Sequence, residues 1–152
     1  MRKNENFDVV LAKDCARAFT TSTGLGTVVS LADGEPLATY GTYHCENCRI
    51  CQLAGKQHTL CIQSHIYGMN EAERFGGKYV YFCPLGLTCF TSPIVGTDST
   101  DAKITVGPFL MMGRQDYIHD DLLPRAQMPY DLQELTAEVQ KIPVVPAARV
   151  ED

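Results

Sequence analysis

Six of the seven cysteines in this chain fall between residues 43 and 93, where thiols stand close enough in sequence to act together. Three of them form a Cys-x-x-Cys-x-x-Cys run, and the whole set is Cys45, Cys48, Cys51, Cys61, Cys83 and Cys89. Thiolates at this spacing can place two sulfurs on one zinc ion or iron–sulfur cluster. Cysteine is also among the most buried residue types and behaves as a small apolar side chain. The stretch therefore indicates either a metal site or a thiol-lined interior.

The metal hypothesis has a specific candidate ligand set. Its members are Cys48, Cys61 and Cys83, with Cys45 or Cys51 as a possible fourth ligand. Zinc or an iron–sulfur cluster would suit four thiolates. The run lacks a second, separate Cys-x-x-Cys pair, so structural cysteine is the competing interpretation and no cofactor is certain. Seven is also an odd number, which in a reducing cytosol favours free thiols over a disulfide framework.

The sequence offers little for catalysis. Cys83 with His65 is the one nucleophile and base that can be paired, and nothing in their spacing brings them together. The string Gly24-Leu25-Gly26 lacks the third glycine of a phosphate-binding loop. The aspartates of the polar segments read as solvated turn residues: Asp98, Asp101, Asp120 and Asp121. We therefore expect that the protein is not an enzyme.

Charge and hydropathy exclude two classes of partner. The net charge is −5 and the pI about 5.3, whereas phosphate binding requires clustered Lys and Arg. The apolar runs are strand-sized, far short of a membrane span, and residues 2–6 are polar or charged rather than a signal-peptide core. The composition predicts a folded cytoplasmic protein with no membrane partner and no direct contact with nucleic acid.

The first part of the chain reads as a helix followed by a β-hairpin. A helical repeat of apolar residues between Asn6 and Thr21 consists of Phe7, Val10, Leu11, Cys15, Ala18 and Phe19. The segments Thr27–Leu31 and Glu35–Tyr40 have strand character, and Asp33-Gly34 between them is a hairpin-turn signal. We expect the helix to bury that apolar face.

The middle of the chain, which includes the cysteine-rich region, is predicted to be helical. Residues 42–55 predict one or two short helices across the sheet face, and a longer helix follows from Thr59 to Gly76-Gly77. The apolar face predicted for this longer helix is Ile62, His65, Ile66, Met69 and Ala72.

Three strands and a final helix complete the prediction. The strands are Lys78–Phe82, Thr88–Val95 and Lys103–Met112, with Pro93 expected at an edge or bulge and Pro108 at an irregularity. Asp131 has the character of an N-cap for a short amphipathic helix with Leu132, Leu135 and Val139 on one side.

This order predicts an α+β fold, a PAS-like five-stranded antiparallel sheet with crossing helices and flanking N- and C-terminal helices. We expect residues 1–125 to form the sensory domain, including the N-terminal helix. Residues 126–152 would then hold the C-terminal helix and the start of a linker to an output domain outside this chain.

Several short motifs, taken in their joint order, carry a family resemblance. They are Thr23-Gly24 before a strand, Cys48, Cys61, Tyr81-Phe82-Cys83, Gly86-Leu87, Pro93-Ile94 and Gly113. In this order and spacing the chain resembles the PocR sensory domain family from about the first helix to Gly113. The family departs from this sequence in two places: it usually has His after the third cysteine, where Pro84 stands here, and an acidic residue soon after Gly-Leu, where Cys89 stands.

The resemblance implies a PAS variant that binds small organic molecules, often diols, ahead of AraC-type DNA-binding helices or a histidine kinase. The function expected is therefore the sensing of a short organic metabolite by a transcriptional regulator, with DNA bound only through the output domain. A cysteine-based metal or redox sensor on the same fold is the alternative. PAS-like domains commonly pair through a flanking helix, which predicts a homodimer seam at Phe7, Val10 and Leu11 or at Leu132 and Leu135.

The predicted ligand-binding residues surround the Cys83 turn and the inner strands. Aromatic and sulfur side chains there could supply the mostly apolar wall of a small-molecule site. The set is Tyr43, Cys83, Phe90, Ser92 and Met112. Residues that alternate along a strand usually pack in the core, so core packing is the competing role for each of these five residues.

Overall fold

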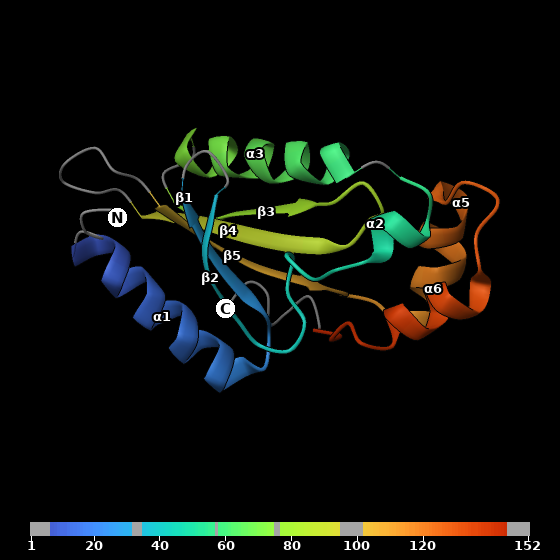
Figure 1. Ribbon diagram of the computed structural model, residues 1–152, viewed down its shortest axis with the longest axis horizontal. Helices are drawn as coiled ribbons and strands as arrows, with labels where there is room; N and C mark the ends of the chain where they lie inside the picture. The colour runs from blue at the N-terminus through green and yellow to red at the C-terminus, as the bar shows by residue number, and fades with distance from the viewer. Residues whose placement is uncertain (1–6, 32–34, 57, 75–76, 95–101, 146–152) are drawn as a thin grey trace.

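The protein is built on a five-stranded antiparallel sheet with the strand order β2-β1-β5-β4-β3 (Figure 1). The computed structural model describes residues 7–31, 35–56, 58–74, 77–94 and 102–145. The strands are β1 (Thr27–Leu31), β2 (Pro36–Tyr40), β3 (Tyr79–Phe82), β4 (Thr88–Ile94) and β5 (Ala102–Phe109). The predicted α+β fold is therefore confirmed. The Asp33-Gly34 turn and the loop after residue 94 lie outside the described residues.

Strand β5 is the centre of the sheet because it pairs with β1 on one side and β4 on the other. All of its residues except Ile104 are buried. Strand β4 is also an interior strand, but Pro93 lies beyond the end of its pairing with β3, which reaches only Thr91. Pro93 does pair with Lys103 of β5, but its other side has no partner in β3, and a proline without a backbone N–H is tolerated where one side of the strand is unpaired.

The two long helices cover opposite faces of the sheet, with α1 (Phe7–Thr23) on one side and α3 (His58–Arg74) on the other (Figure 1). Strand alternation assigns neighbouring residues of β4 to different faces. Phe90 packs against Phe19 of α1, whereas Cys89 faces the cavity beside α3. Each face of the sheet therefore has a separate set of partners.

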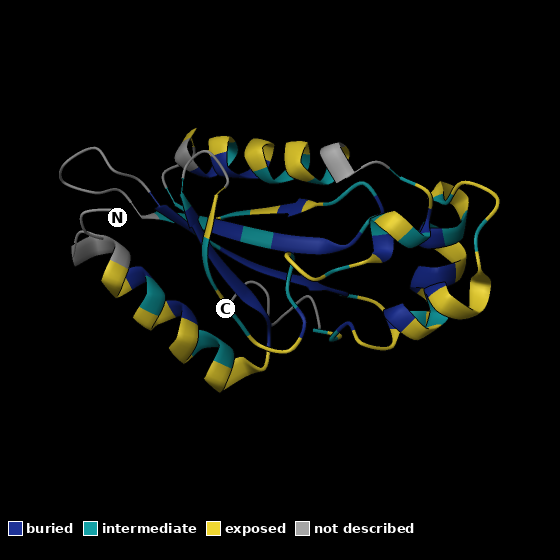
Figure 2. Ribbon diagram, in the orientation of Figure 1, coloured by how far each residue is buried: buried dark blue, intermediate teal, exposed yellow. Residues whose placement is uncertain are grey.

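The buried side of α1 differs from the predicted one. Ala12 and Ala16 are the buried residues that pack with Val29, while Val10 and Leu11 are 45% and 47% exposed. Cys15 and Ala18 are exposed as well. Buried and exposed residues alternate along α1 (Figure 2). Alanine lets the helix backbone approach the sheet closely, so the contact stripe runs along the small residues rather than the larger ones. The side chain of Phe7 lies outside the described part of the chain.

Helix α3 is also rotated relative to its predicted face. Met69 and Ala72 are buried as expected, but Ile62 and Ile66 are exposed. The contact instead passes through Gly68, where a Cβ would lie 2.5 Å from the Tyr81 ring. Because Gly68 has no side chain, the ring of Tyr81 packs directly against the helix backbone.

A compact set of short helices forms a second core beside the end of the sheet. It contains α2 (Ile50–Leu53), α4 (Arg114–Tyr117), the π-helical turn η1 (Ile118–Leu122), α5 (Leu123–Arg125) and α6 (Leu132–Val139). Sequence reasoning missed residues 114–125 as a helical region and placed Asp120 and Asp121 in turns, whereas both belong to η1. The strand predicted to reach Met112 ends at Phe109, because the Leu110 backbone pairs with Pro143 and Val145 instead.

Helix α6 packs into this second core. Its N-cap is Asp131, whose carboxylate accepts hydrogen bonds from the backbone N–H groups of Gln133 and Glu134, as predicted. Leu135 and Val139 are fully buried beside Tyr117 and Leu85, whereas Leu132 is exposed. Leu135 is therefore a core residue and cannot belong to a dimer seam. In the described parts of the chain, no helix combines the length and apolar character needed to cross a membrane.

Candidate ligand-binding site

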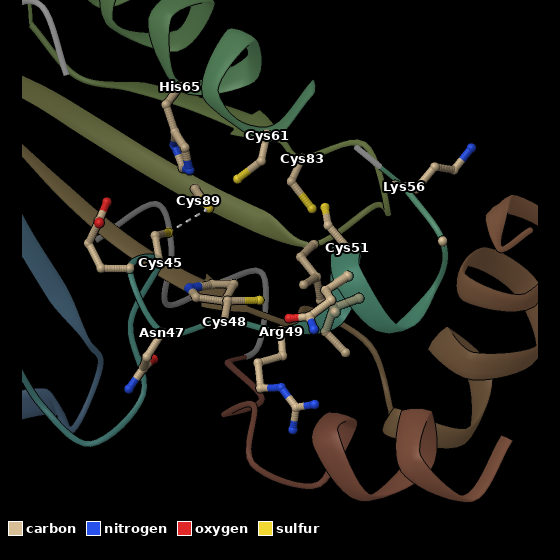
Figure 3. A pocket seen from close by; sticks show the side chains of 16 residues that line it. Cys45, Asn47, Cys48, Arg49, Cys51, Lys56, Cys61, His65, Cys83 and Cys89 are labelled. Atoms are coloured by element: carbon tan, nitrogen blue, oxygen red, sulfur yellow. Dashed lines mark hydrogen bonds between the residues drawn. The ribbon is translucent and has the colours of Figure 1, made fainter. Parts of the chain in front are cut away.

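A cavity of about 660 Å³ lies between the cysteine-rich segment, α3 and the turn that joins β3 to β4. Small-molecule sites typically have volumes of roughly 300–1,000 Å³. Six cysteines line this cavity together with His65, Ile50, Leu87 and Pro108 (Figure 3). The side chains of Asn47, Arg49 and Lys56 point away from the sulfurs (Figure 3). The interior is therefore dominated by thiols and apolar groups.

Different elements supply the thiols, so the cavity exists only in the folded chain. Cys45 and Cys48 come from the irregular segment before α2, Cys51 from α2, and Cys61 from α3. The opposite wall carries Cys83, which follows β3, and Cys89 of β4. Cys15 is an exposed residue of α1 and takes no part in the site.

The turn between β3 and β4 fixes Cys83. The Cys83 N–H donates to the Leu87 carbonyl at 2.9 Å, and the Gly86 N–H donates back to the Cys83 carbonyl at 2.9 Å. Gly86 has a φ of +83°, which a residue without Cβ adopts at little cost. The Tyr117 hydroxyl donates to the Leu85 carbonyl at 2.8 Å and anchors the turn to the second core. Burial raises the pKa of the Cys83 thiol to about 12, so it stays protonated at neutral pH.

Cys45 has the opposite electrostatic environment. Its sulfur lies 3.7 Å from the sulfur of Cys89 (Figure 3). The hydrogen bond with Cys89, followed by one with His65, lowers the pKa of Cys45 to about 6 although burial opposes the shift. Burial also disfavours the charged form of His65, but hydrogen bonds with Cys45 and Cys61 raise its pKa to about 10. At neutral pH the two groups form a thiolate and imidazolium pair.

Two further side chains support this pair. Tyr81 of β3 forms a hydrogen bond through its hydroxyl with Nδ1 of His65, which fixes the plane of the imidazole. Lys103 of β5 is buried, and its ammonium donates to the His65 carbonyl oxygen at 3.4 Å. Burial lowers the pKa of Lys103, and the charge of Cys45 acts against that shift. Cys45 thus shares a small pocket with two basic side chains from different elements, His65 of α3 and Lys103 of β5.

The cysteine-rich segment is tied to α6 by one buried carboxylate. Glu138 accepts a hydrogen bond from the Tyr43 hydroxyl at 2.9 Å and another from the Arg49 N–H at 3.2 Å. Its second oxygen pairs with Lys141 at 3.2 Å. Burial acts to raise the pKa of Glu138, but these three partners outweigh it and lower the pKa. The Tyr43 hydroxyl also lies 3.2 Å from the sulfur of Cys48, a cavity residue.

Across the described residues, no three His, Cys, Asp or Glu side chains have an arrangement that would hold a metal ion. The predicted ligands Cys48, Cys61 and Cys83 do share the cavity wall, and so do Cys45 and Cys51. Metal binding by this set therefore stays a prediction.

A family model described as the sensory domain found in PocR matches residues 5–152. The chain belongs to the PocR sensory domain family. The match confirms the family resemblance and extends it over nearly the whole sequence. Cys48, Cys61 and Cys83, which belong to the motifs of the sequence resemblance, all line the cavity.

The chain was also compared with solved structures and with curated proteins. A crystal structure of an IclR family transcriptional regulator from Brucella abortus is similar at 15% sequence identity, with a TM-score of 0.42. The similarity covers 90% of this PocR family chain and 64% of the regulator, so the chain spans less than two thirds of that protein's length. No curated protein matches the sequence.

The predicted ligand-binding residues separate into two groups. Cys83 lies on the cavity wall. Tyr43 is buried against α6, Phe90 packs between Phe19 and Phe109 on the α1 side, and Met112 is 40% exposed. Ser92 follows the same alternation as Phe90, and none of these four residues lines the cavity.

Sequence reasoning also missed important neighbours. The thiol and imidazole pairing that it considered joined Cys83 to His65, whereas the thiols that form hydrogen bonds with His65 are those of Cys45 and Cys61. Glu138 was not singled out, because the two partners that connect it to the cysteine-rich segment, Tyr43 and Arg49, are remote in sequence. Lys103 could have been noticed as a charged residue in an otherwise apolar and β-branched strand.

Proposed function

We propose that this domain senses a short, neutral organic metabolite such as a diol, which enters the thiol-lined cavity. The observation that carries this proposal is the cavity itself, about 660 Å³ in volume, in a chain of a sensory domain family. Its apolar and thiol wall suits the carbon skeleton, and backbone groups and thiols can meet one or two hydroxyls. The proposed role of the cavity is binding rather than catalysis.

A route from the cavity to the rest of the molecule supports a sensory role. Ligand contact with Cys48 would act on the segment that carries Tyr43 and Arg49, both of which donate hydrogen bonds to Glu138. A ligand that binds one arrangement of this segment better than another shifts the population toward it. Helix α6 would then report the occupancy of the cavity to a following output domain.

The output domain we propose is a DNA-binding one of the AraC type, so that the metabolite controls transcription. Under the proposed division, residues 1–125 form the sensor and residues 126–152 lead from it to the output domain. Val10 and Leu11 of α1 are exposed apolar residues, which supports pairing of two domains along this helix. The proposed setting is the cytoplasm, where metabolites and DNA are both accessible.

Thermal unfolding with a panel of short diols tests the binding proposal. A ligand at a hundred times its dissociation constant should stabilise the domain by about 2.7 kcal/mol. The variant Cys61→Phe, which fills the cavity, should abolish the shift, and Cys15→Phe on the exposed side of α1 should preserve it. A shift that survives in Cys61→Phe would move the ligand to another site.

A metal or redox sensor in the same cavity is the second candidate, and the six thiols on its wall favour it. Native mass spectrometry of protein purified without oxygen separates the two candidates. A mass excess that fits zinc or an iron–sulfur cluster would support the metal sensor. An excess that fits a small organic molecule would support the metabolite sensor.

A further inference from the structure

We propose that Cys45 and Cys89 form an oxidation site, at which a small hydroperoxide converts the two thiols into a disulfide. The site is a property of this thiol pair and stands whether or not the cavity also binds a metabolite. Four observations support it: the distance between the sulfurs, the irregular backbone that carries one of them, their access to the cavity and the cations around Cys45.

The sulfurs are already neighbours, with 3.7 Å between them. A disulfide requires a sulfur–sulfur distance of about 2.05 Å. Cys89 is a buried residue of the interior strand β4, whereas Cys45 lies in an irregular turn outside any helix or strand. A local adjustment of the Cys45 turn can therefore close the gap, and β4 need not move.

The charge around Cys45 favours a nucleophilic sulfur. His65 forms hydrogen bonds with it, and the ammonium of Lys103 belongs to the same small pocket beside α3. Cationic neighbours stabilise a thiolate, which is the form that attacks a peroxide. Glu46 also borders this pocket and is the one carboxylate among its described lining residues. Two basic side chains and one carboxylate therefore border the pocket beside Cys45.

Both sulfurs can be reached by a small oxidant because both line the main cavity. An oxidised Cys45 has a second thiol, that of Cys89, only 3.7 Å away, so a hydroperoxide that oxidises Cys45 leaves a neighbour in position to complete the disulfide.

The chemistry proceeds in two balanced steps. The Cys45 thiolate attacks one peroxide oxygen, the oxygen–oxygen bond breaks, and the leaving alkoxide or hydroxide takes a proton from the His65 imidazolium. Sulfur loses two electrons and becomes a sulfenic acid, while the peroxide becomes an alcohol or water. The Cys89 sulfur then attacks the Cys45 sulfur, a disulfide forms, and the sulfenic hydroxyl leaves with the Cys89 proton as water.

The disulfide would fix the segment that carries Tyr43 to β4, next to the cavity. Tyr43 also contacts Glu138 of α6, so oxidation and the proposed ligand would act on the same segment. This coupling rests on the proposed function, whereas formation of the disulfide does not.

The test is treatment of the reduced 152-residue chain with one equivalent of hydrogen peroxide, followed by alkylation, digestion and mass spectrometry. We expect a loss of two hydrogens per chain and a cross-linked peptide that joins Cys45 to Cys89. The matched control Cys15→Ser should give the same product, since Cys15 lies on α1 away from the cavity. In Cys89→Ser, Cys45 should stop at the sulfenic acid, which a 1,3-dione reagent traps.

Three results would overturn the proposal. One is a cross-link between Cys51 and Cys61, which are hydrogen-bonded neighbours in the same cavity. Another is equal reactivity of Cys45 and Cys83 toward peroxide. The third is a full set of reduced thiols after treatment. The variant His65→Asn should slow sulfenic acid formation about tenfold by removing the cation and proton donor, and far-ultraviolet circular dichroism would verify that it is folded.

Discussion

Glu138 of α6 accepts a hydrogen bond from the hydroxyl of Tyr43 at 2.9 Å, although the two residues are 95 positions apart in the chain. The same carboxylate oxygen accepts the Arg49 N–H, so it contacts both ends of the segment that contains Cys45 and Cys48. Glu138 is almost fully buried, and a buried carboxylate is tolerated only when it is well paired. This contact connects the wall of the cavity to the last described helix.

Replacement of Glu138 by alanine should lower the free energy of unfolding by about 2 kcal/mol, because two donors lose their acceptor in the protein interior. Urea denaturation measures the change. Glu134→Ala is the matched control: it lies on the exposed side of the same helix, and its loss should cost less than about 1 kcal/mol. Equal losses for the two variants would mean that the Glu138 contacts contribute nothing specific.

The carboxylate of Glu138 should make the free energy of unfolding depend on pH. Its pKa in the folded protein is lowered, so its contribution is complete above its ordinary pKa and is lost as pH falls through the folded value. Wild-type protein should therefore lose more stability than Glu138→Ala as the pH falls below about 4.3, the ordinary pKa of a glutamate. Parallel pH profiles for the two proteins would contradict this assignment.

Cys45 should be the fastest-alkylated cavity thiol at neutral pH. Its lowered pKa of about 6 means that the thiolate predominates above this pH and is lost as pH falls through it. The rate with iodoacetamide should rise with a midpoint near pH 6, whereas an ordinary cysteine has a midpoint of about 8.5. Cys83 serves as the internal control, since its pKa of about 12 predicts slow reaction. Peptide mass spectrometry after timed labelling reads both rates, and a midpoint above about pH 8 would disprove the pairing with His65.

Gly68→Ala should disturb the contact between α3 and β3. The added Cβ would meet the Tyr81 ring at 2.5 Å, which forces the helix outward. We expect a loss of stability of roughly 1–3 kcal/mol from overpacking. Because Tyr81 orients His65, the alkylation midpoint of Cys45 should also rise. Gly77→Ala is the control, because nothing lies within 4 Å of its Cβ position, and its stability should change little.

The exposed residues Val10 and Leu11 should form a homodimer seam. If α1 pairs with α1 of a second copy, the double variant Val10→Glu with Leu11→Glu should weaken association at least about tenfold by placing charge in an apolar contact. Ala18→Glu, at another exposed position of α1, should leave it unchanged. Sedimentation equilibrium measures the constant. A wild-type protein that stays monomeric with and without ligand would refute the seam.

Much of the fold could be predicted from local patterns. The five strands follow β-branched and aromatic alternation, and α3 and α6 follow helical periodicity with a polar cap at Asp131. The gathering of cysteines between residues 43 and 93 likewise points to the region of the cavity. These signals depend only on neighbours in the sequence, so they survive without tertiary information.

The rotation of the helices was decided by packing. Val10 and Leu11 of α1 predicted the wrong face, because Ala12 and Ala16 allow a closer approach to the sheet, whereas Phe19 of the predicted face does pack against Phe90. In the same way, Gly68 brings α3 against Tyr81 and leaves Ile62 exposed. Hydrophobic periodicity measures which side of a helix is apolar, but the closest contact is set by how small the facing residues are.

The sequence by itself determined the elements, their order and the thiol-rich nature of the site. Tertiary structure decided which of those thiols is activated: His65 meets Cys45 and Cys61 rather than Cys83, and Cys45 meets Cys89 of a strand far along the chain. It also decided that Glu138 joins the cavity wall to α6. Such pairings depend on distances between elements and on burial, which shift pKa values and hydrogen bonds in ways that spacing along a chain does not encode.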